Sequence, residues 1–467
     1  MKKHIISLLV LLLLVSSSLV GVSNPITSLD SGNHSPIRII GNEQFTEENG
    51  VTGGSGTADD PYIIENWVIV SDGSASQGIF INNTDAYFII RNCTISGFQH
   101  PTDYRQGITL AEVTNGVIQD TKVNESATGI DLRYSAENKI QNCTCSDSYD
   151  DASGYGIYIF HSINTTIIGC KCYNLRWGIH ASESSRIILQ KTECYDNLNA
   201  GFISLDVPAT HFLIEDSTFF NNGWGGIDLS GVSAPYPSGT IIRNCSFYSN
   251  GLEPVENLYY NGLSIRRFRN TTIENCTFQQ NGYGLALWDR VKNIIIRNCS
   301  FLYNEQEGLD IAGEFMFFTF APNTEISYCD FIGNKEGGLL LYATRGTRVH
   351  HCWFMNNSKN GVVVAFCSAQ LTSNNFVNNG IEYTDENGSC GACLWASSTD
   401  IRNNYWGNPE GPSVSLLVRS NNHTAKLIPI RVIDDSDTIL FQGVFGRLVS
   451  RFRPWLSEPV PNAGRQT

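Results

Sequence analysis

The sequence predicts an all-β protein, a parallel β-helix solenoid of about 13 coils with a cap at each end. The first observation is a recurring Gly-Ile-x-Ile phrase, as at residues 78–81 and 226–229. Its leading glycines are Gly78, Gly107, Gly129, Gly156, Gly178, Gly201, Gly226, Gly262, Gly284, Gly308, Gly338, Gly361 and Gly391. Their spacing varies from 22 to 36 residues, which indicates one structural unit plus loops. A propeller blade needs about 40 residues, so the spacing excludes a propeller.

The second observation is that apolar and polar residues alternate through the repeat, whose second half reads Ile-Glu-Asn-Cys-Thr-Phe at residues 273–278. This alternation predicts strands with one buried face, and helical periodicity is nearly absent. Two or three short strands fit within 22 residues only if each repeat is one turn of a coil. Residues 37–407 are therefore predicted to form a rod, roughly 60 Å long at the spacing of stacked strands.

The third observation is that like residues recur at two inward positions of the repeat. The first position holds Cys93, Thr121, Cys143, Cys170, Thr192, Ser217, Cys245, Cys276, Cys299, Cys329, Cys352, Asn374 and Asn404. The second holds Ile95, Val123, Cys145, Cys172, Cys194, Phe219, Phe247, Phe278, Phe301, Phe331, Phe354, Phe376 and Trp406. These columns contain 11 of the 14 cysteines, which we interpret as small buried hydrophobes and expect to be reduced. Cys367, Cys390 and Cys393 lie outside the columns, and we expect a local disulfide near the last coil.

Two further columns predict the turns of the coil. The residue before the cysteine position is usually Asn, Asp or Gly, which tolerate the left-handed conformation of a sharp corner. Three residues after the aromatic position, asparagine recurs at Asn197, Asn222, Asn250, Asn281, Asn304, Asn334, Asn357 and Asn379. Stacked amides can hydrogen-bond along the column, so we interpret these asparagines as structural.

The ends of the chain divide it into segments. Residues 1–23 carry two lysines, an apolar run and small residues, which predicts a signal peptide and a secreted or cell-surface protein. The apolar run is too short for a transmembrane span. Residues 24–69 are predicted to form an N-terminal segment and cap, residues 70–410 the β-helix, and residues 411–467 a C-terminal cap or tail. The net charge of -14 and the lack of basic clusters argue against nucleic-acid binding.

The segment at residues 439–456 has apolar residues at helical spacing. They are Phe441, Val444, Phe445, Leu448, Phe452 and Trp455. We predict a helix that covers the open strand edges at the end of the rod. The alternative is an amphipathic helix that lies on a membrane surface.

Candidate chemistry lies on one outward face, because the x side chain of Gly-Ile-x-Ile and the residue after the second Ile should both point away from the core. This face mixes carboxylates, arginines and aromatic rings, a set suited to sugars. The constellation predicted for general acid–base catalysis is His180, Asp206, Asp228 and Arg266. Asp228 and Asp310 should lie roughly 14 Å apart, whereas glycoside hydrolysis needs carboxyls about 5 to 9.5 Å apart.

A second cluster on the same face is predicted to bind a ligand. Its members are Trp288, Asp289, Arg290, Asp310 and Glu314, with Tyr342 further along the column. The alternative is that both clusters are scattered surface residues. An acidic loop holds Asp147, Asp150 and Asp151, whose oxygens are suitable ligands for calcium. An ordinary acidic turn is the alternative, and we expect no other metal or cofactor.

The repeats resemble those of a known family. Asn-Gly-Tyr-Gly-Leu at residues 281–285, Ile-Arg-Asn-Cys-Ser-Phe at 296–301 and the ending at 403–412 are similar to pectin-lyase-like proteins, most of all the NosD-type group. The resemblance covers about residues 60–410 and implies a right-handed parallel β-helix, a hand that the crossover preference also favours. It implies little about function, because these are scaffold motifs. The catalytic motif set of polygalacturonases is absent, and Asn-Thr-Asp at 83–85 stands alone. With only three methionines, the sequence has no His/Met cluster for copper.

Three functions follow as expectations. The first is a secreted or cell-surface protein that binds a polysaccharide or cell-surface glycan on the outward Gly-Ile-x-Ile face. The second is a polysaccharide lyase, hydrolase or epimerase that uses carboxylates of the same face. The third is a purely structural surface protein. A carboxylate pair within catalytic range in a loop-walled groove would favour the enzyme, and a flat face would favour binding or structure.

Overall fold

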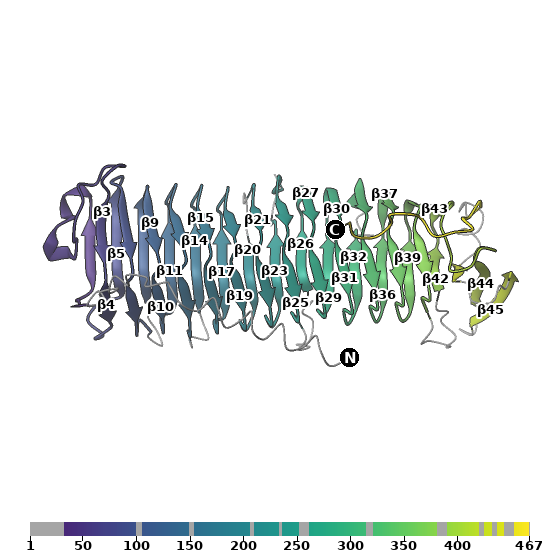
Figure 1. The fold of residues 1–467 in the computed structure, drawn as a ribbon, viewed down its shortest axis with the longest axis horizontal. Coiled ribbons are helices and arrows are strands. Elements are labelled where there is room, and N and C mark those ends of the chain that lie inside the picture. The colour runs from purple at the N-terminus through teal and green to yellow at the C-terminus, as the bar shows by residue number, and fades with distance from the viewer. Residues whose placement is uncertain are drawn as a thin grey trace, which may run out of the picture.

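The computed structural model of the protein describes most of the chain after the first thirty-one residues. The described residues are 32–99, 105–148, 154–205, 210–232, 236–251, 261–313, 321–380, 390–419, 425–431, 437–442 and 453–466. They form a long rod of stacked coils, with the N-terminal coils in purple at one end and the C-terminal coils in green at the other (Figure 1). The predicted signal peptide lies outside the described residues.

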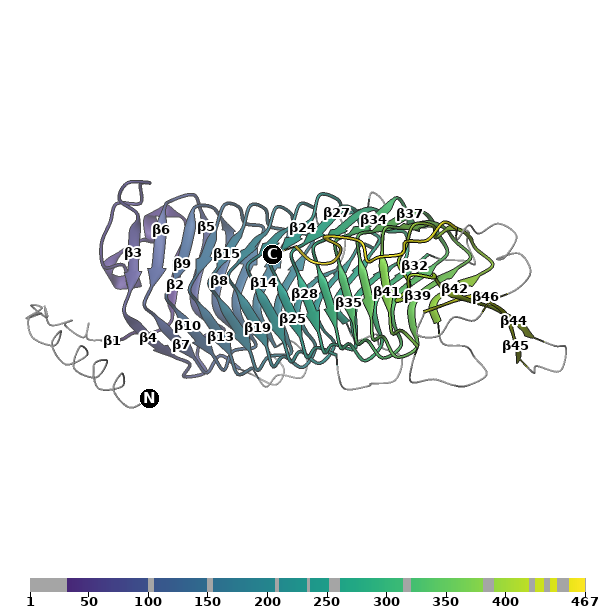
Figure 2. The same ribbon diagram turned by 45° about the vertical axis from the view of Figure 1, so that its right-hand side comes forward.

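Three parallel sheets run the length of the rod (Figure 2). Sheet A has 14 strands, β1 (Gly32–Asn33), β4 (Trp67–Val70), β7 (Thr94–Ser96), β10 (Lys122–Asn124), β13 (Thr144–Ser146), β16 (Lys171–Tyr173), β19 (Glu193–Tyr195), β22 (Thr218–Phe220), β25 (Ser246–Tyr248), β28 (Thr277–Gln279), β31 (Ser300–Leu302), β35 (Asp330–Ile332), β38 (Trp353–Met355) and β41 (Asn375–Val377).

Sheet B carries the Gly-Ile-x-Ile phrases. Its parallel strands are β2 (Ile37–Ile40), β5 (Gln77–Thr84), β8 (Gln106–Val113), β11 (Thr128–Arg133), β14 (Tyr155–Phe160), β17 (Trp177–Ser182), β20 (Ala200–Leu205), β23 (Gly225–Ser230), β26 (Asn261–Arg266), β29 (Tyr283–Trp288), β32 (Glu307–Ala312), β36 (Gly337–Tyr342), β39 (Asn360–Ala365), β42 (Cys390–Trp395) and β46 (Thr438–Gln442). Beyond β46, β44 (Ser413–Arg419) pairs with β46 in parallel and with β45 (Ala425–Arg431) in antiparallel.

Sheet C follows sheet B in each coil. Its strands are β3 (Tyr62–Glu65), β6 (Phe88–Arg91), β9 (Gly116–Gln119), β12 (Lys139–Gln141), β15 (Thr166–Ile168), β18 (Ile188–Gln190), β21 (Leu213–Glu215), β24 (Ile241–Arg243), β27 (Arg269–Glu274), β30 (Lys292–Arg297), β33 (Ala321–Pro322), β34 (Thr324–Ser327), β37 (Thr344–His350), β40 (Ser368–Thr372) and β43 (Ser398–Asp400). Two short 3-10 helices, η1 (Asn42–Gln44) and η2 (Glu47–Asn49), precede β3.

The predicted parallel β-helix is confirmed, with slightly fewer complete coils among the described residues than the 13 leading glycines suggest. The last glycine, Gly391, opens β42, but that coil ends in an isolated bridge between Asn375 and Tyr405 instead of a third strand. At the other end, β2, β3 and β4 already pair with β5, β6 and β7. The chain before the first leading glycine therefore contributes to all three sheets.

The inward columns form the core as predicted. All fourteen cysteines lie in the described ranges, where they are buried and form no disulfide. The phenylalanines stack ring on ring along the rod, and the stack runs from Phe219 to Phe376 and ends on Trp406, whose ring lies 4.5 Å from that of Phe376. The local disulfide expected near the last coil is wrong, since neither Cys390 nor Cys393 forms a disulfide and the Cys390 sulfur instead contacts Asn360 Oδ1 at 3.2 Å.

The corner before the cysteine position has the predicted left-handed backbone. Its φ angle is 52° at Asn92, 51° at Asn142 and 57° at Asn298. Even Lys191, which has no short polar side chain, adopts 50° there. Asparagine suits this position because its side chain tolerates positive φ at low cost.

The buried asparagine column is a continuous hydrogen-bonded ladder. Asn250 Nδ2 donates to Asn281 Oδ1 at 3.0 Å, and Asn281 Nδ2 donates to Asn304 Oδ1 at 3.3 Å. Every described step from Asn197 to Asn379 points the same way. The ladder ends on a carboxylate, because Asn379 donates from its backbone nitrogen and from Nδ2 to the two oxygens of Asp437.

The C-terminal helix prediction is wrong where the structure can test it. Residues 438–442 form strand β46, which pairs with β42 and β44 and so satisfies the open edge of sheet B. Residues 443–452 lie outside the described part of the chain. Residues 453–466, in yellow, run back along the outside of the rod toward β30 (Figure 1). Within the described ranges, no helix has the length and hydropathy needed to cross a membrane.

Candidate functional site

The candidate face is the outer surface of sheet B. Adjacent strands approach closely at the leading glycines, where a Cβ on Gly284 would stand 2.3 Å from the carbonyl oxygen of Gly308. The residue just before the glycine also points outward, which sequence analysis missed. This follows from Tyr155 and Tyr158, whose ring centroids lie 5.1 Å apart across the glycine. Each strand therefore presents three outward positions, namely before the glycine, two after it and four after it.

The x column is less exposed than expected. Asp131 and Ala286 are fully buried, and Asp310 keeps 7% of its surface. Asp131 Oδ2 accepts a hydrogen bond from Arg133 Nε at 2.7 Å. Burial raises the pKa of Asp131 to about 6, against the opposing effect of Arg133. Outward orientation on a strand therefore does not mean access to solvent here.

The predicted catalytic constellation is only partly assembled. Arg266 Nη2 donates to Asp228 Oδ2 at 3.2 Å across two neighbouring strands. Burial raises the pKa of Asp228, opposed by Arg266, although a quarter of the carboxylate side chain is exposed. His180 lies two strands from Asp228 in the register, about 10 Å at the usual strand spacing. Asp206 lies outside the described residues.

His180 belongs to an aromatic cluster instead. Its ring centroid is 5.3 Å from that of Tyr155, 5.1 Å from Tyr158 and 6.5 Å from Trp177. Trp177 in turn meets Trp224 edge to face at 5.0 Å. Burial lowers the pKa of His180 to about 4, so the imidazole is neutral at physiological pH. A neutral ring among aromatic side chains is poorly placed to pair with the distant Asp228.

The second cluster does come together. A shallow pocket of about 440 Å³ is lined by Ser230, Arg266, Arg267, Trp288, Asp289, Asp310, Ala312 and Gly313. Trp288 Nε1 donates to Asp310 Oδ2 at 2.9 Å, which fixes the indole above the sheet. Asp289 forms ion pairs with Arg267 and, at 3.7 Å, with Arg290. The pocket thus joins an aromatic ring to carboxylates and guanidinium groups.

The remaining predicted residues lie around this pocket. Arg290 turns away, since its Nη1 donates to the Tyr236 hydroxyl at 2.9 Å. Tyr342 lies two strands beyond Trp288, next to Ala312 in the register. Glu314 lies outside the described part of the chain.

Glu307 is a site residue that sequence analysis missed. It occupies the position before the leading glycine of β32, on the same strand as Asp310. Burial, and then the nearby Asp310, raise the pKa of Glu307 to about 7. Burial raises the pKa of Asp310 to about 6, against the hydrogen bond from Trp288. The sequence signal that could have identified Glu307 is an acidic residue directly before a leading glycine, here Gly308.

Carboxylate spacing limits the chemistry of this face. Asp228 and Asp310 occupy equivalent positions three strands apart. This separation of roughly 14 Å exceeds the range of paired glycosidase carboxyls. Asp310 lines the pocket, and Glu307 lies on the same strand outside the pocket lining, where the charge of Asp310 reaches it. The face can therefore bind through charge-assisted hydrogen bonds and stacking, and it carries two acids, Glu307 and Asp310, whose pKa values are raised chiefly by burial.

The calcium prediction rests mostly on residues that the structure does not describe, Asp150 and Asp151. Asp147 lies at a corner with a φ of 59°. Its carboxylate accepts hydrogen bonds from Ser146 Oγ at 2.7 Å and Asn174 Nδ2 at 3.0 Å. Among the described residues, no group of three or more His, Cys, Asp or Glu side chains is arranged to hold a metal.

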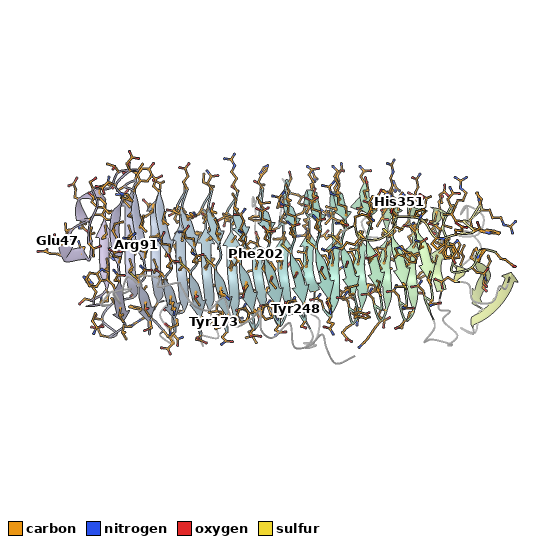
Figure 3. All side chains as sticks on the ribbon, viewed as in Figure 1. Glu47, Arg91, Tyr173, Phe202, Tyr248 and His351 are labelled. Carbon is orange, nitrogen blue, oxygen red and sulfur yellow. The ribbon has the colours of Figure 1, made fainter. Side chains whose placement is uncertain are left out.

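A second aromatic row lies on the outer face of sheet A, where Tyr173 and Tyr248 mark the lower edge of the rod (Figure 3). The rings of Tyr173 and Tyr195 stack at 4.9 Å, and those of Phe220 and Tyr248 stack at 4.8 Å. Tyr195 and Phe220 connect the two pairs at 4.7 Å. Because the ring faces cover one another, this row presents ring edges to solvent and suits sugar stacking less than Trp288 does.

Comparison with known proteins agrees with the fold. A family model described as a right-handed beta helix region matches residues 77–234, 148–257 and 230–405. No curated protein matches the chain.

Solved structures with similar folds are distant in sequence. The Dettilon tailspike protein is 14% identical over 66% of this chain and 61% of its own, with a TM-score of 0.47. A variant of a periplasmic alginate epimerase is 12% identical over 90% of this chain and 85% of its own, with a TM-score of 0.44. The A-module of an Azotobacter vinelandii mannuronan C-5 epimerase is 11% identical over 67% of this chain and 86% of its own, with a TM-score of 0.35. This chain thus spans less than two thirds of the tailspike.

The family match, which extends through most of the rod, shows that the chain belongs to the right-handed β-helix family.

Proposed function

We propose that this protein is a secreted or cell-surface protein that binds a polysaccharide on the outer face of sheet B. The observation that carries the proposal is the pocket at β26, β29 and β32, where Asp310 holds the indole of Trp288 beside the Arg266–Asp228 ion pair. Sugars are bound by an aromatic surface against their C–H faces and by charged groups that hydrogen-bond to their hydroxyls. Both kinds of group line this pocket.

Binding without turnover is the favoured form of the proposal. The acid–base constellation expected from the sequence is divided, since His180 lies in the aromatic cluster and Asp228 is committed to Arg266. An ion-paired carboxylate and a neutral imidazole two strands away do not form a proton-transfer pair. The pocket is also shallow, whereas enzymes exclude water from the reacting bond.

A polysaccharide-active enzyme is the second candidate, and Glu307 and Asp310 favour it. Two interacting acids with raised pKa values are a feature of general acid–base sites. Incubation of the protein with any glycan that it binds, followed by analysis of the products, separates the two candidates. If the parent yields glycan products and Glu307→Gln does not, the protein is an enzyme.

The binding proposal is tested by applying the purified mature protein to a glycan array and measuring affinity for each hit. Trp288→Ala should weaken binding roughly tenfold, because it removes the stacking surface. Asp228→Asn should also weaken binding, because it disturbs the guanidinium of Arg266. Both variants should keep the melting temperature of the parent.

Tyr303→Ala is the matched control, since Tyr303 is 54% exposed and lies away from sheet B. If Trp288→Ala and Asp228→Asn bind the ligand like the parent, this face is not the site. Repeating the assay with a chelator tests the calcium prediction for the acidic loop at Asp147.

A further inference from the structure

One outward column of sheet B alternates between aromatic residues and alanine. The position four residues after the leading glycine places Trp288 beside Ala312 and Ala312 beside Tyr342. The pattern continues with Tyr342 beside Ala365 and Ala365 beside Trp395. At this position, aromatic rings therefore recur on every second coil over β29, β36 and β42, and alanine occupies the same position on β32 and β39.

The spacing of these rings is set by the backbone. Neighbouring strands lie about 4.8 Å apart, so successive aromatic residues of the column are roughly 10 Å apart along the rod. Phe366 links the last two, with ring centroids 5.7 Å from Tyr342 and 5.1 Å from Trp395. Trp395 is 45% exposed, although a tryptophan ring in a folded protein is usually well covered.

We infer that Trp288, Tyr342 and Trp395 form a track for an unbranched, ribbon-like polysaccharide of β-1,4-linked pyranose rings that lies parallel to the rod. The inference rests on the proposed binding at the Trp288 pocket and extends it over four coils. In such a ribbon, successive rings are turned over, so every second ring presents the same face. Two rings of an extended chain cover about the length of two coils, so each aromatic side chain meets an equivalent sugar face.

Other arrangements fit the column less well. A chain that crossed the rod would contact one or two coils and could not use both Trp288 and Trp395. A helical chain, such as an α-1,4-linked glucan, would curve away from a straight row of rings. Ala312 also matters, because a larger side chain there would lift the ribbon off the rings of Trp288 and Tyr342 on either side.

The track is tested with a length series of β-1,4-linked glucose oligosaccharides, from disaccharide to hexasaccharide, and with the α-1,4-linked series as comparison. The affinity of the parent should rise with length in the β-linked series and stay flat in the α-linked series. Trp395→Ala should lose about threefold to tenfold in affinity for the hexasaccharide and nothing for the disaccharide, since only a long chain reaches from Trp288 to Trp395. Tyr303→Ala should behave like the parent with every length.

The outcomes separate the two proposals. If Trp288→Ala weakens binding of another glycan while Trp395→Ala binds every chain length like the parent, the track is overturned and the binding proposal stands. Equal length dependence in the α-linked series also overturns the track. If the array contains no glycan that binds the parent, the proposed function fails and the track fails with it.

Discussion

Asp437 is the residue on which the buried asparagine ladder ends. Both of its carboxylate oxygens accept hydrogen bonds from Asn379, from the backbone nitrogen at 3.0 Å and from Nδ2 at 2.7 Å. Every asparagine of the ladder donates toward the C-terminal end, so the last partner must offer an acceptor oxygen. Asp437 offers one carboxylate oxygen to each of the two donors, whereas the amides inside the ladder receive both donors on one oxygen.

Asp437 should make stability depend on pH. Burial raises its pKa to about 7, while the hydrogen bonds from Asn379 oppose the shift. Because the folded pKa is above the unfolded one, the folded state holds the proton more tightly. The resulting stabilisation is complete below about pH 4 and is lost as the pH rises to 7, by up to about 4 kcal/mol.

The measurement is the free energy of unfolding of the C-terminal coils from pH 4 to pH 7.5, in the parent and in Asp437→Asn. The variant cannot titrate, so this part of the slope should disappear. A variant with the same pH slope as the parent would show that other groups cause the dependence.

At the scale of elements, the ladder connects each coil to the next. Asn281 Oδ1 accepts from the backbone nitrogen of Asn250 at 3.1 Å and from its Nδ2 at 3.0 Å, while Asn281 Nδ2 donates to the Phe247 carbonyl at 3.0 Å. Asn281 is fully buried, so water cannot replace these bonds. The strands of sheet A and sheet B on either side depend on this corner.

Asn281→Ala should therefore lower the free energy of unfolding by about 2 to 4 kcal/mol, because buried donors of Asn250 lose their acceptor. Gln279→Ala, at the end of β28 two residues before Asn281, is the control and should change stability by less than about 0.5 kcal/mol. Urea unfolding followed by circular dichroism measures both. Similar midpoints for the two variants would contradict a structural role for the ladder.

At the scale of the whole molecule, the C-terminal tail fastens distant coils together. Leu456 donates to the Asn404 carbonyl, Val460 to Asn375 Oδ1 at 2.7 Å and Gly464 to the His351 carbonyl at 2.7 Å. Arg465 then reaches Thr277 Oγ1 at 2.6 Å. The tail thus runs against the direction of the coils and crosses several of them.

Truncation after Glu458 should lower the melting temperature and speed amide hydrogen exchange in the coils from β28 to β41. Each of the lost hydrogen bonds contributes on the order of 1 kcal/mol. Arg465→Ala should speed amide exchange only in the coil near Thr277, because it removes only the tail's contacts with that coil. If the exchange rate rises equally along the whole rod, or does not rise, the tail does not stabilise these coils locally.

The sequence could not predict this path, for a physical reason. The tail contacts join residues far apart in the chain, such as Trp353 Nε1 and the Ala463 carbonyl at 3.2 Å, and no local pattern encodes them. The same limit explains the wrong helix at residues 439–456. Its spacing of apolar residues is a local signal, but the unpaired edge of β42 recruits residues 438–442 as a strand.

The candidate site shows the same division. Trp288 and Asp310 were identified because period-two alternation places them on one face, and Asp289 because it directly follows that column; the structure brings all three into one pocket. Glu307 was missed because the bend at the leading glycine turns an extra position outward, which alternation alone does not predict. His180 was grouped with Asp228, but two intervening strand spacings keep them apart.

The sequence by itself determined the coil, its register and its inward columns, because these depend on alternation within a strand and on repetition at a spacing that each coil must satisfy. Positive φ at the corners is also local, so Asn92, Asn142 and Asn298 revealed it. Only the tertiary structure decided which outward side chains are buried, which of them meet across coils, and where the chain ends run. Those features depend on how neighbouring coils pack and on contacts between residues that are distant in sequence.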